Sequence, residues 1–196
     1  SSFNIAKNNL SVNDIKLLLL SGKKIKLSRS SVLKVKKSRD FLSKKVMKDD
    51  VLIYGVNTGF GSLCDKSISL KEINILQTNL ILSHACGVGN QVPDDVVRII
   101  LLLKIRSLAF GFSGVRLELI NRLVSFYNHN LFPVIFEQGS LGASGDLAPL
   151  AHLSLPLIGR GDVSFNKKNI SAKIALKKIN KQPIDLSFKE GLALLN

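Results

Sequence analysis

The chain is poor in several residue types and segments. Its 196 residues include two cysteines, one methionine and no tryptophan. Cys64 and Cys86 are too few for a disulfide framework. The apolar runs at 17–20 and 99–103 are far shorter than the roughly 20 residues that a membrane span requires. The basic, serine-rich start also lacks the continuous apolar segment of a secretory signal. We therefore expect a cytoplasmic protein with no membrane partner.

Acidic residues are scarce as well. The 28 Lys and Arg outnumber the 14 Asp and Glu, which gives a net charge of +14 and suggests a nucleic-acid partner. The excess is +9 over residues 1–50 (13 against 4), +1 over 51–160 (8 against 7) and +4 over 161–196 (7 against 3). The basic stretch from 28 to 47 offers only Phe41 for stacking on bases. We expect solvated helix faces at the ends of the chain and no nucleic-acid binding.

The remaining composition is that of a folded domain. Hydrophobic residues make up 45% of the chain and charged residues 21%, which is enough to bury a core and excludes general disorder. The length favours one domain. We expect three regions within it: a basic helical region at 1–50, a central region at 51–160 that holds the unusual motifs, and the start of a further region at 161–196.

Apolar periodicity predicts a mainly α fold with a few short strands. Ser11 and Asp14 have the spacing of a capping box, so a helix should begin there and end at Gly22. Proline followed by Asp94 and Asp95 predicts another helix start. We expect helices at about 28–47, 70–85, 93–110, 115–128 and 147–158, a strand at 23–27, a buried strand from Val51 that leads into a glycine-rich loop, and an extended segment at 131–137.

The segment Gly142-Ala143-Ser144-Gly145-Asp146 has three possible interpretations. Ser144 or Asp146 could cap the helix that follows, with the small residues allowing a tight turn. Ser144 could instead be the nucleophile of a serine hydrolase, with His152 as its base. However, the nucleophile elbow requires glycine two residues after the serine, where this chain has Asp146.

The third interpretation makes Ala143-Ser144-Gly145 the precursor of an electrophile. Gly145 has no side chain, so its amide nitrogen can approach the carbonyl carbon of Ala143 at little steric cost. Ring closure with loss of one water, followed by loss of the Ser144 hydroxyl as a second water, leaves a methylidene group conjugated to an imidazolone. Ordinary side chains supply no comparable electron sink, which is why such reactions usually need a cofactor.

Four blocks of sequence stand out. They are Tyr54-Gly55-Val56-Asn57-Thr58-Gly59-Phe60-Gly61, Leu82-Ser83-His84-Ala85 with Gly87-Val88-Gly89, Gly139-Ser140-Leu141-Gly142-Ala143-Ser144-Gly145-Asp146-Leu147-Ala148-Pro149-Leu150-Ala151-His152, and Glu190-Gly191-Leu192-Ala193-Leu194-Leu195-Asn196. The two glycine pairs at 59–61 and 87–89 lack the third glycine of a nucleotide-binding loop. Together the four blocks resemble the aromatic amino acid ammonia-lyase family. They cover about residues 50 to 196 in the family's order, which is more specific than any single block.

This resemblance implies a role for each matched residue. Ala143, Ser144 and Gly145 would form 4-methylidene-imidazol-5-one autocatalytically, with Asp146 assisting and with no metal or nucleotide. Tyr54 would be the base that removes the β-proton, a role that requires a site favouring the phenolate, because the pKa of an ordinary phenol is near 10. The substrate would be held by Ser83, His84 and Asn196, with His84 at its imidazole and Asn196 near the electrophile or the carboxylate.

The Ser83-His84 pair resembles the histidine branch of the family, because relatives that act on phenylalanine or tyrosine place more apolar pairs here. A site that hydrogen-bonds a polar group rejects analogues that lack it. The resemblance therefore implies non-oxidative deamination of L-histidine to urocanate and ammonia, in a homotetramer. A lyase or aminomutase acting on tyrosine or phenylalanine remains an alternative. We also expect the chain to be truncated after Asn196, so that it is the N-terminal part of one catalytic domain and inactive alone, with only an assembly or binding role as the other alternative.

Overall fold

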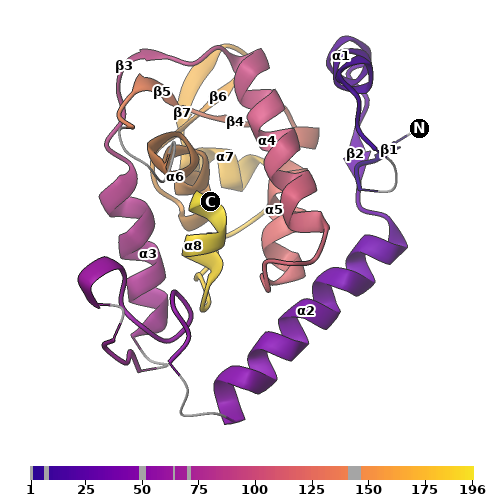
Figure 1. Ribbon diagram of the computed structural model, residues 1–196. Helices are drawn as coiled ribbons and strands as arrows, with labels where there is room; N and C mark the ends of the chain where they lie inside the picture. Colours follow the sequence, from indigo (N-terminus) through magenta and orange to yellow (C-terminus); the bar gives the residue numbers. More distant parts are fainter. Residues whose placement is uncertain (1, 7–8, 49–51, 64, 70–71, 141–146) are drawn as a thin grey trace.

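The computed structural model describes residues 2–6, 9–48, 52–63, 65–69, 72–140 and 147–196 (Figure 1). Within these residues the fold is mainly helical, as predicted, with short strands at its edges. The α-helices are α1 (Val12–Ser21), α2 (Arg29–Lys48), α3 (Ile73–His84), α4 (Asp94–Ala109), α5 (Leu117–Asn128), α6 (Leu147–Ser154), α7 (Ala172–Lys178) and α8 (Glu190–Leu195), and the 3₁₀ helices are η1 (Gly61–Leu63) and η2 (Leu155–Ile158).

The N-terminal helix α1 has the predicted ends. Ser11 Oγ accepts a hydrogen bond from the backbone N–H of Asp14 at 3.2 Å, and the Asp14 carboxylate accepts one from the backbone N–H of Ser11 at 2.8 Å. Gly22 closes the helix in the left-handed region at φ +58°. The following strand, β2 (Ile25–Lys26), pairs in parallel with β1 (Phe3–Asn4). The capping box and glycine stop are therefore confirmed.

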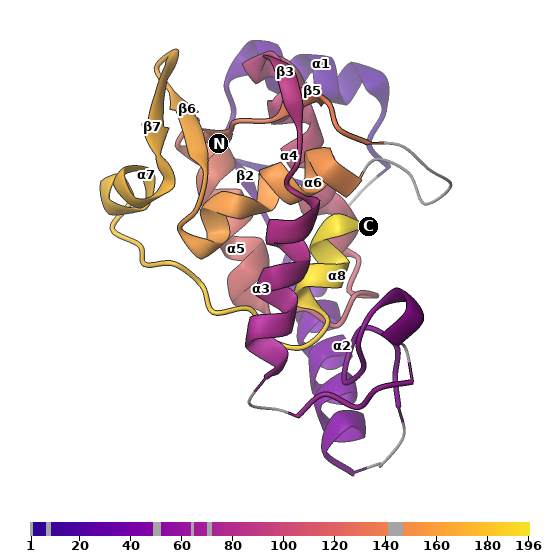
Figure 2. The ribbon, with the colours of Figure 1, turned by 90° about the vertical axis from the view of Figure 1, so that its left-hand side faces the viewer.

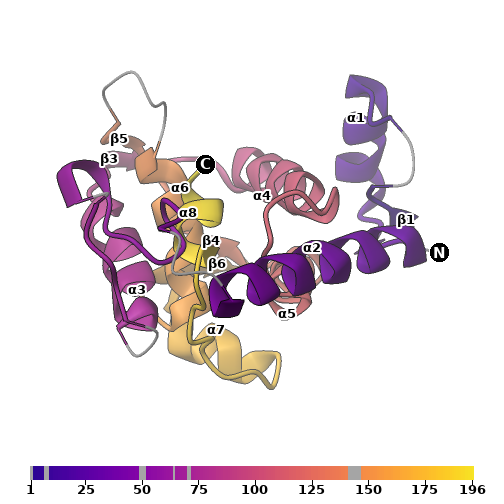
Figure 3. The same cartoon turned by 60° about the horizontal axis from the view of Figure 1, so that its bottom comes forward.

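Helix α2 lies across one side of the molecule and carries much of the basic charge (Figure 3). Val35 is fully buried on its inner face, whereas Lys34, Lys36 and Lys37 are exposed. This separation is the amphipathic pattern that the sequence predicts, with the lysines on a solvated helix face.

The core forms where α4 packs against α5. Leu101 and Ile105 of α4 and Leu119, Leu123 and Phe126 of α5 are fully buried. The spacing of these residues places the apolar side chains of each helix on one face.

A second group of helices, α3, α6 and α8, packs together beside this core (Figures 1 and 2). Helix α8 is fixed at its first residue by Glu190, whose fully buried carboxylate accepts hydrogen bonds from Arg116 at the start of α5. The same hydrogen bonds raise the pKa of Arg116 above its ordinary value. This ion pair joins the first residue of α8 to the start of α5, and so helps to set the position of α8.

Short strands join the loops around these helices. Strand β3 (Val88–Gln91) pairs antiparallel with β5 (Phe136–Gln138). Strand β6 (Asp162–Phe165) lies between β4 (Phe132–Pro133) and β7 (Lys168–Ser171), both antiparallel to it. Asn166 and Lys167, both at positive φ, form the two-residue turn between β6 and β7.

Two local predictions need correction, and one strand was missed. Residues 52 and 53 have no regular structure and 54–57 form a turn, so the described part of the expected buried strand is absent; Leu52 and Tyr54 are 45% and 51% exposed. An apolar run of this length is ambiguous from sequence, and here the glycine-rich motif sets the backbone. The helix expected at 147–158 changes to 3₁₀ geometry at Leu155, because Pro156 has no N–H to continue an α-helix. Strand β3 was not predicted, since all four of its residues are exposed and lack alternation.

Candidate active site

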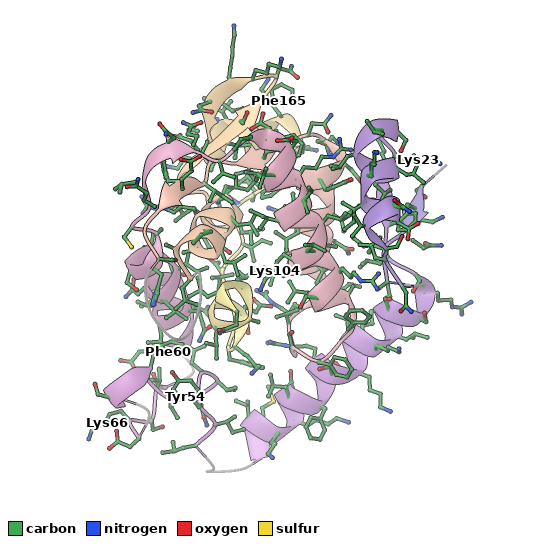
Figure 4. The ribbon with its side chains drawn as sticks, turned by 45° about the horizontal axis from the view of Figure 1, so that its top comes forward. Lys23, Tyr54, Phe60, Lys66, Lys104 and Phe165 are labelled. Atoms are coloured by element: carbon green, nitrogen blue, oxygen red, sulfur yellow. The ribbon has the colours of Figure 1, made fainter. Side chains whose placement is uncertain are left out.

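Three of the predicted site residues line one cavity of about 470 Å³. Tyr54 comes from the loop before η1, His84 from the last turn of α3, and Asn196 from the end of α8. They are separated by up to 142 positions in the chain, so the fold and not the sequence brings them together. Figure 4 shows Tyr54 and Phe60 on neighbouring parts of the same loop. The remaining lining residues are Phe60, Gly61, Leu80, Leu147, Leu192 and Leu195.

Tyr54 is held at the cavity by its own loop. Its ring meets the Phe60 ring edge to face, with the centroids 5.9 Å apart and the planes at 87°. Its phenol oxygen accepts a hydrogen bond of 3.4 Å from the backbone N–H of Gly61. A backbone donor aimed at this oxygen stabilises negative charge there, which is what a phenol that acts as a base requires.

Gln77 joins the Tyr54 loop to α8. Its side chain is fully buried in α3. The amide nitrogen donates to the Gly55 carbonyl at 3.4 Å, and the amide oxygen accepts from the backbone N–H of Leu192 at 3.2 Å. A buried amide that satisfies both of its ends rigidifies the segments it connects. Two of the segments that line the cavity are thus held by one side chain.

The hydrogen bonds of His84 define its tautomer. His84 Nδ1 lies 2.8 Å from the Leu80 carbonyl oxygen, which can only accept, so Nδ1 carries the proton and donates it. In the neutral ring, Nε2 is then the acceptor. Ser83 is exposed and is not among the residues that line the cavity. Its hydroxyl donates to the same carbonyl at 3.0 Å and lies 3.1 Å from His84 Nδ1, so it contacts the ring rather than the cavity.

Asn196 reaches the cavity from the C-terminal end of α8. Its side-chain nitrogen donates to the Leu192 carbonyl at 3.1 Å, within the same helix. The side chain is exposed. Its amide oxygen is the polar atom that can accept a hydrogen bond from a ligand.

The predicted electrophile precursor, Ala143, Ser144 and Gly145 with Asp146, lies outside the described residues. Leu147, which follows Asp146 directly, lines the cavity. On the other side of the segment, Ser140 Oγ accepts a hydrogen bond of 3.1 Å from the backbone N–H of Ala148. The two ends of the segment are therefore joined beside the cavity. A tripeptide-derived electrophile is therefore compatible with the described residues that flank the segment.

His152, which the serine-hydrolase interpretation needs as a base, is engaged elsewhere. Its ring is buried in α6 and packs against Phe136 at a centroid distance of 5.2 Å. Nε2 accepts a hydrogen bond of 2.9 Å from the backbone N–H of Gly87, and burial lowers the pKa of the imidazole. A Cβ on Gly139 would lie 2.7 Å from the Gly87 Cα, so three segments meet closely at this point.

A second cavity of about 560 Å³ shares Leu147, Leu195 and Asn196 with the first and is otherwise lined mostly by apolar residues of α4, β5 and α6. Among the described residues there is no cluster of three or more His, Cys, Asp or Glu that could bind a metal ion. In that part of the chain no helix combines the length and apolar character needed to cross a membrane.

Two buried polar residues within helices are not evident from the motifs, namely Gln77 and Lys104. The signal in the sequence is weak, since Lys104 only interrupts the apolar run at 99–105 and Gln77 is one of several polar residues in α3. Leu80 and His84 are four residues apart and therefore lie on one face of α3. This spacing could have identified Leu80 as a lining residue.

The chain belongs to the aromatic amino acid lyase family, whose model matches residues 10–196. Over 187 residues it is 50% identical to a histidine ammonia-lyase of Legionella pneumophila (strain Lens). This match covers 95% of the present chain and 37% of the relative. The chain thus spans little more than a third of the length of this curated relative.

Solved structures show the same fold. A histidine ammonia-lyase from Trypanosoma cruzi matches with a TM-score of 0.86 and 33% identity, over 99% of this chain and 37% of that one. A phenylalanine aminomutase from Pantoea agglomerans matches with a TM-score of 0.91 and 34% identity, over 100% of this chain and 37% of that one. The fold is therefore shared by relatives with different named activities, and substrate choice must be argued from the cavity.

Proposed function

We propose that the full-length protein to which this chain belongs converts L-histidine into urocanate and ammonia without oxidation. The observation that carries the proposal is the cavity that Tyr54, His84 and Asn196 line, with Leu147, two positions after Gly145 in the chain, in its wall. Histidine ammonia-lyases among the relatives support the proposal.

A methylidene-imidazolone formed from Ala143, Ser144 and Gly145 would supply the electrophile that ordinary side chains lack. Helix α6 begins two residues after Gly145, so the positive end of its dipole lies on the tripeptide side. Asp146 stands between them and would assist the cyclisation.

The remaining residues divide the other tasks. Tyr54 Oη takes the β-proton of the substrate, and the Gly61 N–H stabilises the phenolate form that does so. His84 Nε2 accepts a hydrogen bond from the N–H of the substrate's imidazole, because Nδ1 is already committed to Leu80. Ser83 supports that orientation of the ring. Asn196 orients the substrate carboxylate or the electrophile.

The imidazole-to-imidazole contact favours histidine over apolar substrates. A phenyl ring has no N–H to offer Nε2, so this nitrogen of His84 would remain unpaired once the substrate covers it, at a cost of about 1–3 kcal/mol. The alternative, a lyase or aminomutase for phenylalanine or tyrosine, draws support from the aminomutase that shares the fold. The test is to assay the full-length protein with the three amino acids in parallel. Preferential turnover of phenylalanine or tyrosine would contradict the proposal.

The chain by itself is proposed to be inactive. It covers 37% of the length of the Legionella pneumophila enzyme, and the residues that complete the pocket would come from the rest of that length and from other subunits of a cytoplasmic homotetramer. Residues 1–196, expressed alone, should show no urocanate formation. Measurable turnover by the isolated chain would refute this part of the proposal, and size-exclusion chromatography of the full-length protein would test the tetramer.

A further inference from the structure

Lys104 is a buried cation that the reaction described above does not use. It lies in the middle of α4, and only 5% of its surface is exposed. Lysine is almost never buried to this degree without a partner. Burial lowers the pKa of its ammonium group to about 8. None of the carboxylates in the described residues forms an ion pair with it.

Its partners are instead the backbone carbonyls at the end of α8. Lys104 Nζ donates to the Ala193 carbonyl at 2.6 Å and also to the carbonyl of Asn196. Figure 4 shows Lys104 beside the yellow helix α8. The ammonium therefore joins the backbone at Ala193 and Asn196 to α4.

Two cations thus hold this segment. Arg116, just before α5, binds Glu190 at the first residue of α8, and Lys104 of α4 binds the carbonyls of Ala193 and Asn196. Among the described residues, the one hydrogen bond of the Asn196 side chain goes to the Leu192 carbonyl in the helix directly before it. That bond fixes the side chain relative to α8, but it does not fix α8 relative to the cavity.

We infer that Lys104 is a positioning residue, which holds the backbone at Ala193 and Asn196 so that the Asn196 side chain faces Tyr54 and His84 across the cavity. The inference rests on the proposed function, because it assigns a task to Asn196. A neutral side chain of similar length would fill the same space, but it would leave the α8 carbonyls without their donor. A misplacement of about 1 Å at a site of this kind lowers the rate by up to about 100-fold.

The test is a double-mutant cycle in the full-length protein with Lys104→Met and Asn196→Ala. Each single variant should lower kcat/KM by about 10- to 100-fold. If Lys104 acts through Asn196, the double variant should be little worse than Asn196→Ala alone, because residues in one network are not additive. Lys104→Gln keeps an N–H donor, and it serves in the same cycle if Lys104→Met lowers the yield of folded protein.

The matched control is Arg122, a second buried cation, which donates to the Gln182 carbonyl at 2.5 Å and does not line the cavity. Arg122→Met should lower the melting temperature without changing kcat/KM. Its effect should add to that of Asn196→Ala. Additive effects of Lys104→Met and Asn196→Ala, or an unchanged kcat/KM in Lys104→Met, would overturn the inference while leaving the proposed function intact. A wild-type protein inactive on all three amino acids would instead refute the proposed function, and this inference with it.

Discussion

Gly55 and Leu192 lie so close that no side chain fits between them. A Cβ on Gly55 would stand 2.2 Å from Leu192 Cδ2, and Gly55 has a left-handed backbone with φ +70°. Both residues belong to segments that line the cavity, one next to Tyr54 and the other one turn before Asn196. The glycine of this motif is therefore required where the Tyr54 loop meets α8.

Gly55→Ala should abolish most of the activity of the full-length protein and lower its stability. The substitution adds a left-handed strain of about 1–2 kcal/mol and pushes the Tyr54 loop away from Leu192. Gly22→Ala is the matched control, because Gly22 has φ +58° but no atom of the described residues lies within 4 Å of where its Cβ would be. It should carry the backbone strain alone and keep full turnover. Equal activity in the two variants would contradict the role of the close contact.

The mass of the intact protein tests the electrophile directly. The active full-length protein should be lighter than its sequence by two water molecules, and the loss should map to the peptide that contains Ala143, Ser144 and Gly145. Ser144→Ala lacks the hydroxyl that leaves as the second water, so it should lack the methylidene group and nearly all activity. An unmodified mass in an active preparation would rule out the cyclised tripeptide.

His84 should control the choice of substrate. His84→Leu removes the acceptor Nε2, so kcat/KM for histidine should fall on the order of 10- to 100-fold, while turnover of phenylalanine should not fall in parallel. His129→Leu provides the control, because His129 is exposed directly after α5 and, among the described residues, its ring hydrogen-bonds to Ser125 of that helix. Equal losses for histidine and phenylalanine in His84→Leu would argue against an imidazole contact.

Much of the fold was predictable because its signals are local. The capping box at Ser11, the glycine stop at Gly22 and the helix start after Pro93 each depend on a few neighbouring residues. The strand expected from Val51 was wrong in its described part, and strand β3 was missed. Both lie in loops whose backbone depends on distant partners, such as the pairing of Val88 with Gln138.

In the candidate site, too, some residues are evident from local motifs and others depend on distant partners. Tyr54, His84 and Asn196 could be named from motifs, and the structure brings all three to one cavity. Gln77 and Lys104 could not be named, because their partners are backbone groups 22 to 115 positions away in the chain. In the sequence, a buried amide or ammonium appears only as a polar residue among the apolar positions of a helix. Which backbone group it binds depends on how the helices pack, and the sequence does not show this.

The pH dependence of stability should report on His152. Its Nε2 accepts a hydrogen bond from Gly87, so the folded protein requires the neutral ring, and burial lowers the pKa in the folded state. Below the unfolded pKa of about 6.5 the unfolded chain binds more protons, so stability should decrease as the pH falls through that value. His152→Gln keeps an acceptor that does not titrate and should weaken this dependence. His129→Gln, at an exposed position, should leave it unchanged; the same pH profile in all three proteins would exclude His152 as its source.

Replacing the Glu190 carboxylate should destabilise the protein, because this buried group accepts the hydrogen bonds of the Arg116–Glu190 pair. Glu190 accepts hydrogen bonds from Arg116 N, Nε and Nη2 and from the backbone N–H of Ser187, and its side chain is fully buried. Glu190→Gln offers one acceptor oxygen and places an NH₂ against these donors. The free energy of unfolding should fall by about 3 kcal/mol, the lower end for a buried pair, because the Arg116 side chain is 33% exposed.

Glu118 is the matched control for this pair, since it also approaches Arg116, at 3.8 Å, but its side chain is 58% exposed. Glu118→Gln should cost less than about 1 kcal/mol, as surface ion pairs usually do. Urea denaturation followed by circular dichroism measures both variants under the same conditions. Because Glu190 also anchors the first residue of α8, Glu190→Gln should lower kcat at temperatures where the protein is still folded, whereas Glu118→Gln should not. Similar losses of stability in the two variants would show that burial of the carboxylate does not decide the strength of the pair.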